Sequence, residues 1–145
     1  MRVAGFQGLR PIGRRWREIP DYMKEALYEA QEILKEREFS IEGQPIDLIG
    51  YCGGKTPQFE NHTLTCMEHL VIYVTSIAEW NQRNDKESFD ALLGLSFGEW
   101  IAAVVAGCLD YETGLGVVAM RGELTSQVRG RSLLLTGSLP IQALR

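Results

Sequence analysis

The chain has 145 residues, the size of one ordinary domain, and its 45% hydrophobic and 23% charged residues are typical of a soluble globular protein. The net charge of −4 argues against general nucleic-acid binding, which needs a basic face for the phosphate backbone. No apolar run reaches the roughly 20 residues that span a membrane, and residues 1–10 lack the apolar centre of a signal peptide. We therefore expect a cytoplasmic protein that binds neither nucleic acid nor membranes.

Cysteine usage agrees with that expectation. Cys52, Cys66 and Cys108 are odd in number and lack the spacing of metal ligands. Reduced thiols in a cytoplasmic protein are the simplest interpretation, and we expect no metal site.

The N-terminal segment predicts one strand and a connection. Residues 1–8, MRVAGFQG, begin as a short strand that is expected to break at Gly5 and Gly8. Residues 10–20 form a basic connection interrupted by proline and glycine.

The next part of the chain predicts two helices around a long loop. Apolar residues recur at helical spacing over 21–36, with Asp21 as the expected N-cap. Residues 39–58 are rich in turn formers and predict a long loop with short extended pieces. A largely buried helix is expected over 62–82, followed by a polar turn over 81–88.

Strand and helix signals then alternate. Residues 89–96, FDALLGLS, predict a short apolar strand that runs into glycines. A short helix is expected over 98–107, with Gly107 as its C′ glycine. Asp110 is the expected cap of a helix that runs to about Val128.

The last residues predict one more strand and the start of a helix. The strand falls on 132–137, SLLLTG, and the helix on 138–145, with Pro140 in its first turn. The whole order is that of an α/β protein. Because this strand and helical turn have no following partner in the sequence, we expect an interrupted domain.

The stretch GLSFGEW carries the most chemical information. It fits Gly-x-Ser-x-Gly, with Ser96 between Gly94 and Gly98, after a strand and before a helix. In that context a serine can occupy a sharp elbow, and the N–H of Phe97 can stabilise an oxyanion. The alternative is a glycine-flanked serine that only caps a helix.

Further residues carry a family resemblance. The run from Gly94 to Leu124, GLSFGEWIAAVVAGCLDYETGLGVVAMRGEL, resembles the malonyl-CoA:acyl-carrier-protein acyltransferases of fatty-acid and polyketide synthesis. That family reads Gly-His-Ser-(Leu/Phe)-Gly-Glu, an Ala-rich helix, Ala-Gly, an acidic–aromatic pair and Met-Arg-Gly. The matching elements, without a gap, are Gly94–Glu99, Ala102–Ala106, Gly107, Asp110–Tyr111 and Met120–Gly122.

The resemblance extends more loosely toward the N-terminus. Phe6–Gly8 stands where the family has Phe-Pro-Gly-Gln-Gly, and 70–80 matches the helix before the elbow. It implies a partial acyltransferase domain over 1–145. Residues 1–130 would form a hydrolase-like large subdomain with a parallel sheet and nucleophile elbow. Residues 131–145 would start a ferredoxin-like small subdomain, at which the chain is truncated.

The resemblance also implies a reaction and its residues. Ser96 would take a malonyl group from malonyl-CoA as an ester and pass it to the phosphopantetheine thiol of an acyl carrier protein. Gln7 and Phe97 would form the oxyanion hole, and Arg121 would bind the malonyl carboxylate. No metal or further cofactor is implied. The expected partners are the carrier protein, acyl-CoA and the missing C-terminal half of the domain.

Several positions depart from the family pattern. Leu95 replaces the usual histidine before the serine, and neither the Pro-Gly after Phe6 nor the Gln-Pro expected around 65–67 is present. The family's catalytic histidine lies beyond the end of this chain. His62 and His69, seven apart and so expected on one helix face, are assigned a core or surface role.

Other interpretations stay open. The segment 50–54, GYCGG, fits Gly-x-Cys-x-Gly around a cysteine nucleophile, but no apolar helix follows it. The N-terminal connection contains four arginines, Arg10, Arg14, Arg15 and Arg17. They could bind CoA phosphates or an acidic carrier protein, or they could form a solvated arm. The rival functions are an acyl-thioester hydrolase of the same fold and a non-catalytic acyltransferase-like binding fragment. Leu95 and the absent histidine favour the latter, and Arg121 favours the transferase.

Overall fold

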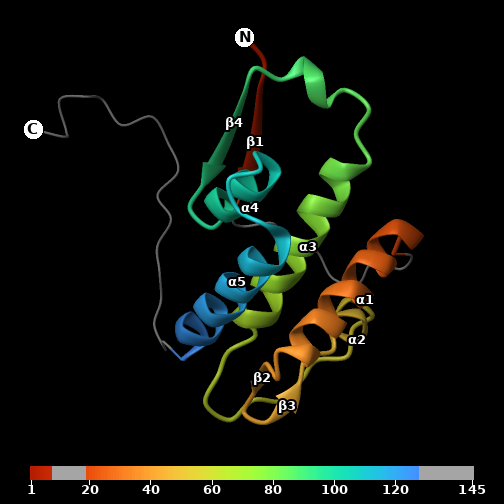
Figure 1. The fold of residues 1–145 in the computed structure, drawn as a ribbon. Helices are drawn as coiled ribbons and strands as arrows, with labels where there is room; N and C mark the ends of the chain where they lie inside the picture. The colour runs from red at the N-terminus through yellow and green to blue at the C-terminus, as the bar shows by residue number, and fades with distance from the viewer. Residues whose placement is uncertain (8–18, 128–145) are drawn as a thin grey trace, which may run out of the picture.

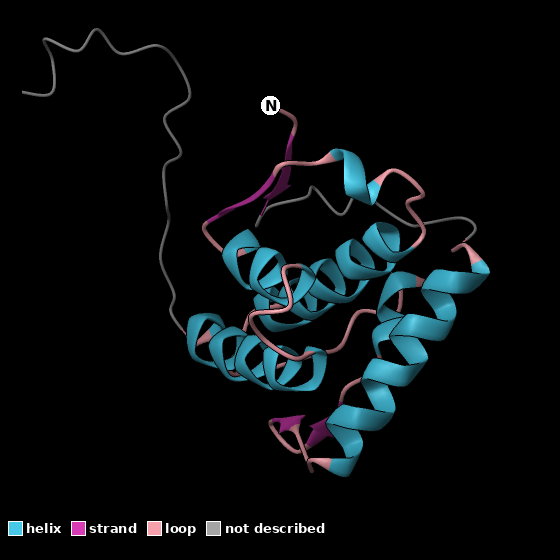
Figure 2. Ribbon diagram, turned by 45° about the horizontal axis from the view of Figure 1, so that its top comes forward, coloured by secondary structure: helices cyan, strands magenta, loops and turns pink. Residues whose placement is uncertain are grey.

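A computed structural model describes residues 1–7 and 19–127 of the chain. Within these ranges the chain forms five α-helices, one 3₁₀ turn and two small sheets. In chain order they are β1 Val3–Gln7, α1 Asp21–Glu36, β2 Ser40–Ile41, β3 Gln44–Pro45, α2 Leu48–Cys52, α3 Thr65–Asn81, η1 Lys86–Ser88, β4 Ala91–Leu95, α4 Gly98–Val105 and α5 Tyr111–Ser126. Figure 2 shows that this part of the chain is mostly helical, with the short strands at its periphery.

A parallel two-stranded sheet joins the first strand to the strand before Ser96. β1 pairs with β4, and the register sets Gly5 opposite Leu93 and Gln7 opposite Leu95 (Figure 1). The predicted break at Gly5 is wrong, because this glycine continues the paired strand. Gly8, the other predicted break, lies outside the described residues.

Helix α3 forms the centre of the core. Its residues are apolar on most sides, which is the pattern of a helix enclosed by other elements, and α1 and α5 pack on it (Figure 1). The buried residues of α3 are Cys66, Met67, His69, Leu70, Val71, Ile72, Tyr73, Val74, Thr75, Ile77 and Ala78.

Small residues on α5 let it approach α3 closely. A Cβ at Gly122 would lie 2.9 Å from the Cα of Cys66, and a Cβ at Gly114 would overlap the Tyr73 hydroxyl. Gly122 follows Arg121, so this close approach places the arginine beside α3.

The N-terminal helix is amphipathic, as predicted, and it buries Met23, Leu27, Ala30 and Leu34. Its bounds match the prediction, but Asp21 is its first helical residue, and the N-cap is Pro20. The predicted cap was therefore wrong, and no side chain caps this end.

The loop predicted over 39–58 contains both expected and unexpected structure. Its extended pieces are β2 and β3, which form an antiparallel hairpin. The short helix α2 was not predicted. Asp47 caps it by accepting a hydrogen bond from the Gly50 N–H at 2.8 Å.

Helix α3 begins at Thr65, three residues later than predicted. His62 therefore lies before the helix, and the expectation that it shares a helix face with His69 is wrong. The polar turn predicted over 81–88 contains the 3₁₀ turn η1.

The two later caps are confirmed. Gly107 has φ +72° directly after the C-cap of α4, and the Asp110 carboxylate accepts from the Thr113 N–H at 2.8 Å at the start of α5. The strand and helix predicted over 132–145 and the four arginines over 10–17 lie outside the described residues. No helix in the described ranges is long and apolar enough to cross a membrane.

Candidate functional site

Ser96 occupies a sharp turn between a strand and a helix. β4 ends at Leu95, α4 begins at Gly98, and Ser96 between them has φ +54°. L-residues rarely adopt this left-handed conformation, and such strain is concentrated at functional sites. The serine is exposed, so its hydroxyl is accessible. The predicted elbow geometry is present.

Gly94 is required for this turn on steric grounds. A Cβ at this position would overlap the backbone of Gly98 and Glu99 in the first turn of α4. The glycine therefore lets the helix fold back onto the end of its own strand. Gly98 is buried at the same contact.

The start of α4 leaves backbone donors beside the serine. The N–H groups of Glu99 and Trp100 donate to the carbonyls of Ser96 and Phe97, each at 3.2 Å. Among the described residues, no hydrogen-bond partner is found for the N–H of Phe97. The first N–H groups of a helix and its positive dipole end favour an anion, so the Phe97 N–H stays the predicted oxyanion donor.

The second predicted oxyanion residue is placed by its backbone. Gln7 is the last residue of β1 and lies opposite Leu95, one residue before the elbow. The register thus brings residue 7 to the strand end that carries Ser96. The position of its side chain is outside what is described.

Arg121 lies at the same end of the core. It is half-buried on α5, and its guanidinium carbon is 5.5 Å from the centre of the Phe97 ring. It forms no ion pair with a carboxylate in the described part of the chain. Phe97 directly follows Ser96, so the predicted cation and elbow are connected through one aromatic ring.

Sequence reasoning missed His69 as part of this group. The His69 imidazole stacks on Phe97, with ring centres 4.6 Å apart and planes at 14°, and its Nδ1 lies 3.5 Å from Nη1 of Arg121. Burial, and then the charge of Arg121, lower the pKa of His69 to about 4, so the ring is neutral at pH 7. A core or surface role was expected for His69, and its contact with Arg121 was not.

His62 takes part in a different cluster. Its Nδ1 lies 2.8 Å from the Glu42 carboxylate, which also accepts from the N–H groups of Glu60 and Asn61. The hydrogen bond with His62, followed by the one from Glu60, lowers the pKa of Glu42 to about 2. This cluster joins the hairpin turn to the segment before α3.

The cysteine alternative has no support in the geometry. Cys52 is the last residue of α2 and is buried, and burial raises the pKa of its thiol to about 11. A nucleophilic cysteine needs a lowered pKa and access to substrate. The Gly-x-Cys-x-Gly match is therefore a helix end.

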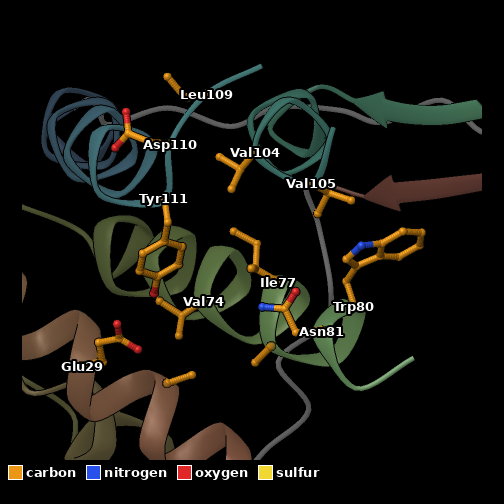
Figure 3. Close-up of a pocket in the computed structure, with 12 residues that line it drawn as sticks. Glu29, Val74, Ile77, Trp80, Asn81, Val104, Val105, Leu109, Asp110 and Tyr111 are labelled. Carbon is orange, nitrogen blue, oxygen red and sulfur yellow. The ribbon is translucent and has the colours of Figure 1, made fainter. Parts of the chain in front are cut away.

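A pocket lies elsewhere, between α1, α3 and the connection from α4 to α5. It has a volume of about 480 Å³, and Figure 3 shows Val74 and Ile77 across it from Val104. Neither Ser96 nor Arg121 lines it. The pocket is therefore not the elbow site.

Comparison with known proteins gives one significant match. The chain is 32% identical over 110 residues to the polyketide biosynthesis protein PksE of Bacillus subtilis (strain 168). The alignment takes in 74% of this chain but 14% of PksE. No protein-family model matches the chain. The chain is thus similar to a short part of a much longer relative, which by itself assigns it to no family.

Proposed function

We propose that this chain carries the nucleophile elbow of an acyltransferase in polyketide biosynthesis, which moves a malonyl group from coenzyme A to an acyl carrier protein. The observation that carries the proposal is the left-handed Ser96 on its strand–elbow–helix turn, with Arg121 against the ring of the next residue. The likeness to a polyketide biosynthesis protein supports the pathway. The fold expected with it is the hydrolase-like large subdomain.

Each residue would have a defined step. The Ser96 oxygen attacks the thioester carbonyl of malonyl-CoA, the Phe97 N–H stabilises the oxyanion, and coenzyme A leaves as its thiol once it gains the serine proton. The carrier thiol then attacks the ester, and its proton returns to Ser96. Arg121 would bind the free carboxylate through two parallel hydrogen bonds, a geometry that lysine lacks.

The proton transfers need a base, and the described residues offer none in contact with Ser96. His69 stacks on Phe97, the residue after Ser96, but its Nδ1 faces Arg121. A serine without a base is a poor nucleophile, although an oxyanion hole and binding alone retain some catalysis. We therefore propose that the base comes from another part of the complete acyltransferase, and that the 145-residue chain alone acylates slowly.

Acylation of Ser96 tests the proposal. Incubation with malonyl-CoA should add one malonyl mass to the peptide that contains Ser96, detected by mass spectrometry of a protease digest over hours. Ser96→Ala should remove this label, and Cys52→Ala should retain it, because Cys52 is buried and protonated. A label that persists in Ser96→Ala would show that the elbow serine is not the nucleophile.

A further inference from the structure

Three side chains from three elements meet behind the elbow. His69 comes from α3, Phe97 from the turn into α4, and Arg121 from α5. His69 and Arg121 both contact the Phe97 ring, at 4.6 Å and 5.5 Å between centres, and they contact each other at 3.5 Å. Each of the three side chains thus contacts the other two, and one of them, Phe97, directly follows Ser96.

The chemistry of the pair determines which atom donates. Arginine is always protonated and has only donors, so Nδ1 of His69 must be the acceptor. The ring is neutral, since its pKa is about 4, and its single proton therefore belongs on Nε2. The separation of 3.5 Å is at the long limit for a hydrogen bond. The contact with His69 therefore orients the Arg121 guanidinium and contributes little to the stability of the fold.

Because the His69 imidazole is a neutral acceptor, it does not neutralise the positive charge of Arg121. A carboxylate at position 69 would pair with the guanidinium and compete with any anionic ligand. Imidazole fixes the direction of the donor without neutralising it. Arg121 also lacks a carboxylate partner among residues 1–7 and 19–127, so a half-buried cation remains available to an anion.

We propose that His69 is a positioning residue, whose imidazole holds the Arg121 guanidinium across the Phe97 ring so that it meets the carboxylate of an acyl group bound at Ser96. The inference rests on the proposed function, because it assigns the choice of a carboxylated acyl group to the pair. A held guanidinium loses less side-chain entropy when the substrate binds, and this gain exists only for substrates with a carboxylate.

Two substitutions distinguish the hydrogen-bond acceptor of His69 from its ring packing on Phe97. His69→Phe keeps a ring that can stack on Phe97 but removes the acceptor, whereas His69→Asn keeps an amide oxygen near the position of Nδ1. The measurement is the initial rate of Ser96 labelling by malonyl-CoA divided by that by acetyl-CoA. We expect His69→Phe to lower this ratio by up to about tenfold, because a guanidinium that is no longer held must be ordered when the carboxylate binds. His69→Asn should remain within about threefold of the wild-type ratio. An unchanged ratio in His69→Phe would overturn the inference.

A second measurement does not depend on acyl chemistry. The ¹⁵N shifts of the His69 ring should show an unprotonated Nδ1 and a protonated Nε2. Arg121→Met should raise the titration midpoint of His69, because it removes a neighbouring positive charge. A proton on Nδ1, or an unmoved midpoint, would show that the pair does not interact.

The two measurements distinguish the possible failures. If the ring has the expected tautomer but wild-type Ser96 is never labelled, the proposed function fails and the role of His69 toward substrate fails with it. If Ser96 is labelled but His69→Phe keeps the malonyl preference, the function stands and the positioning role is wrong.

Discussion

Ser96 presents its hydroxyl from a backbone conformation that serine rarely adopts. At φ +54° an L-residue is strained by roughly 1–2 kcal/mol relative to the right-handed region, whereas glycine is not. A glycine would relieve this strain but would remove the hydroxyl. The chain keeps a serine where the backbone favours glycine, which is the pattern expected when the side chain is needed for chemistry.

His69 should make the stability of the fold depend on pH. Its pKa falls from 6.5 to about 4 on folding, so between these values the unfolded chain binds a proton that the folded chain does not. The free energy of unfolding should therefore decrease as the pH is lowered, by about 2 kcal/mol between pH 7 and pH 5. Urea unfolding at the two pH values measures this decrease.

The matched variant for this prediction is His69→Phe, which cannot titrate. It should lose about 2 kcal/mol less than the wild type between the same pH values. The depressed pKa of Glu42 contributes at lower pH, because that carboxylate is protonated near pH 2 and its unfolded form near pH 4.5. An equal loss in the variant would show that His69 titrates normally in the fold.

The junction of β4 and α4 depends on Gly94. Gly94→Ala would force a Cβ into the backbone of Gly98 and Glu99, which cannot move aside as a flexible side chain can. We expect it to lower the free energy of unfolding by about 3 kcal/mol or more. Gly5→Ala, on the paired strand with nothing near the added Cβ, should be close to neutral. Urea denaturation of both variants measures the difference, and equal effects would contradict the close contact.

The sequence predicted the elements whose signals are local. Helical spacing indicated α1, the end signals Gly107 and Asp110 indicated α4 and α5, and the strand–glycine–serine–glycine order indicated the elbow. Helix α2 was missed because its five residues are too few for periodicity, although Asp47 three residues before Gly50 has the spacing of a cap.

There is a physical reason why the sequence did not predict the contact between His69 and Arg121. His69 and Arg121 are 52 residues apart and meet only because α3 and α5 pack closely through Gly122. Spacing along one chain carries no information about such a crossing. A histidine in a largely apolar helix was the available signal, and it is equally typical of a satisfied core residue.

One face of the parallel sheet of β1 and β4 is apolar and exposed. Leu93 and Leu95 are 63% and 69% exposed, and Val3 on the paired strand is 43% exposed. Side chains alternate along strands, and the register places all three on the same face. Their opposite face carries Phe6, whose ring lies 5.6 Å from Trp80 of α3.

This face should make the isolated chain self-associate. Exposed apolar patches on sheets promote association, and a charge on the patch opposes it. Leu93→Lys should therefore lower the fraction of oligomer in sedimentation velocity runs. Leu124→Lys is the matched control, because Leu124 is 67% exposed on α5. If both variants associate equally, the sheet face is not the cause.

The pairing of β1 with β4 has a consequence for the order of folding. Arg2, just before β1, donates to the Asp90 carboxylate just before β4, and these residues are 88 apart. Closing so long a segment is entropically costly and is favoured only after the intervening helices have become compact. A growing chain on the ribosome must hold its first strand unpaired until β4 has emerged. We therefore expect Ser96 and the end of β1 to come together at a late step of folding, when the helical core already exists.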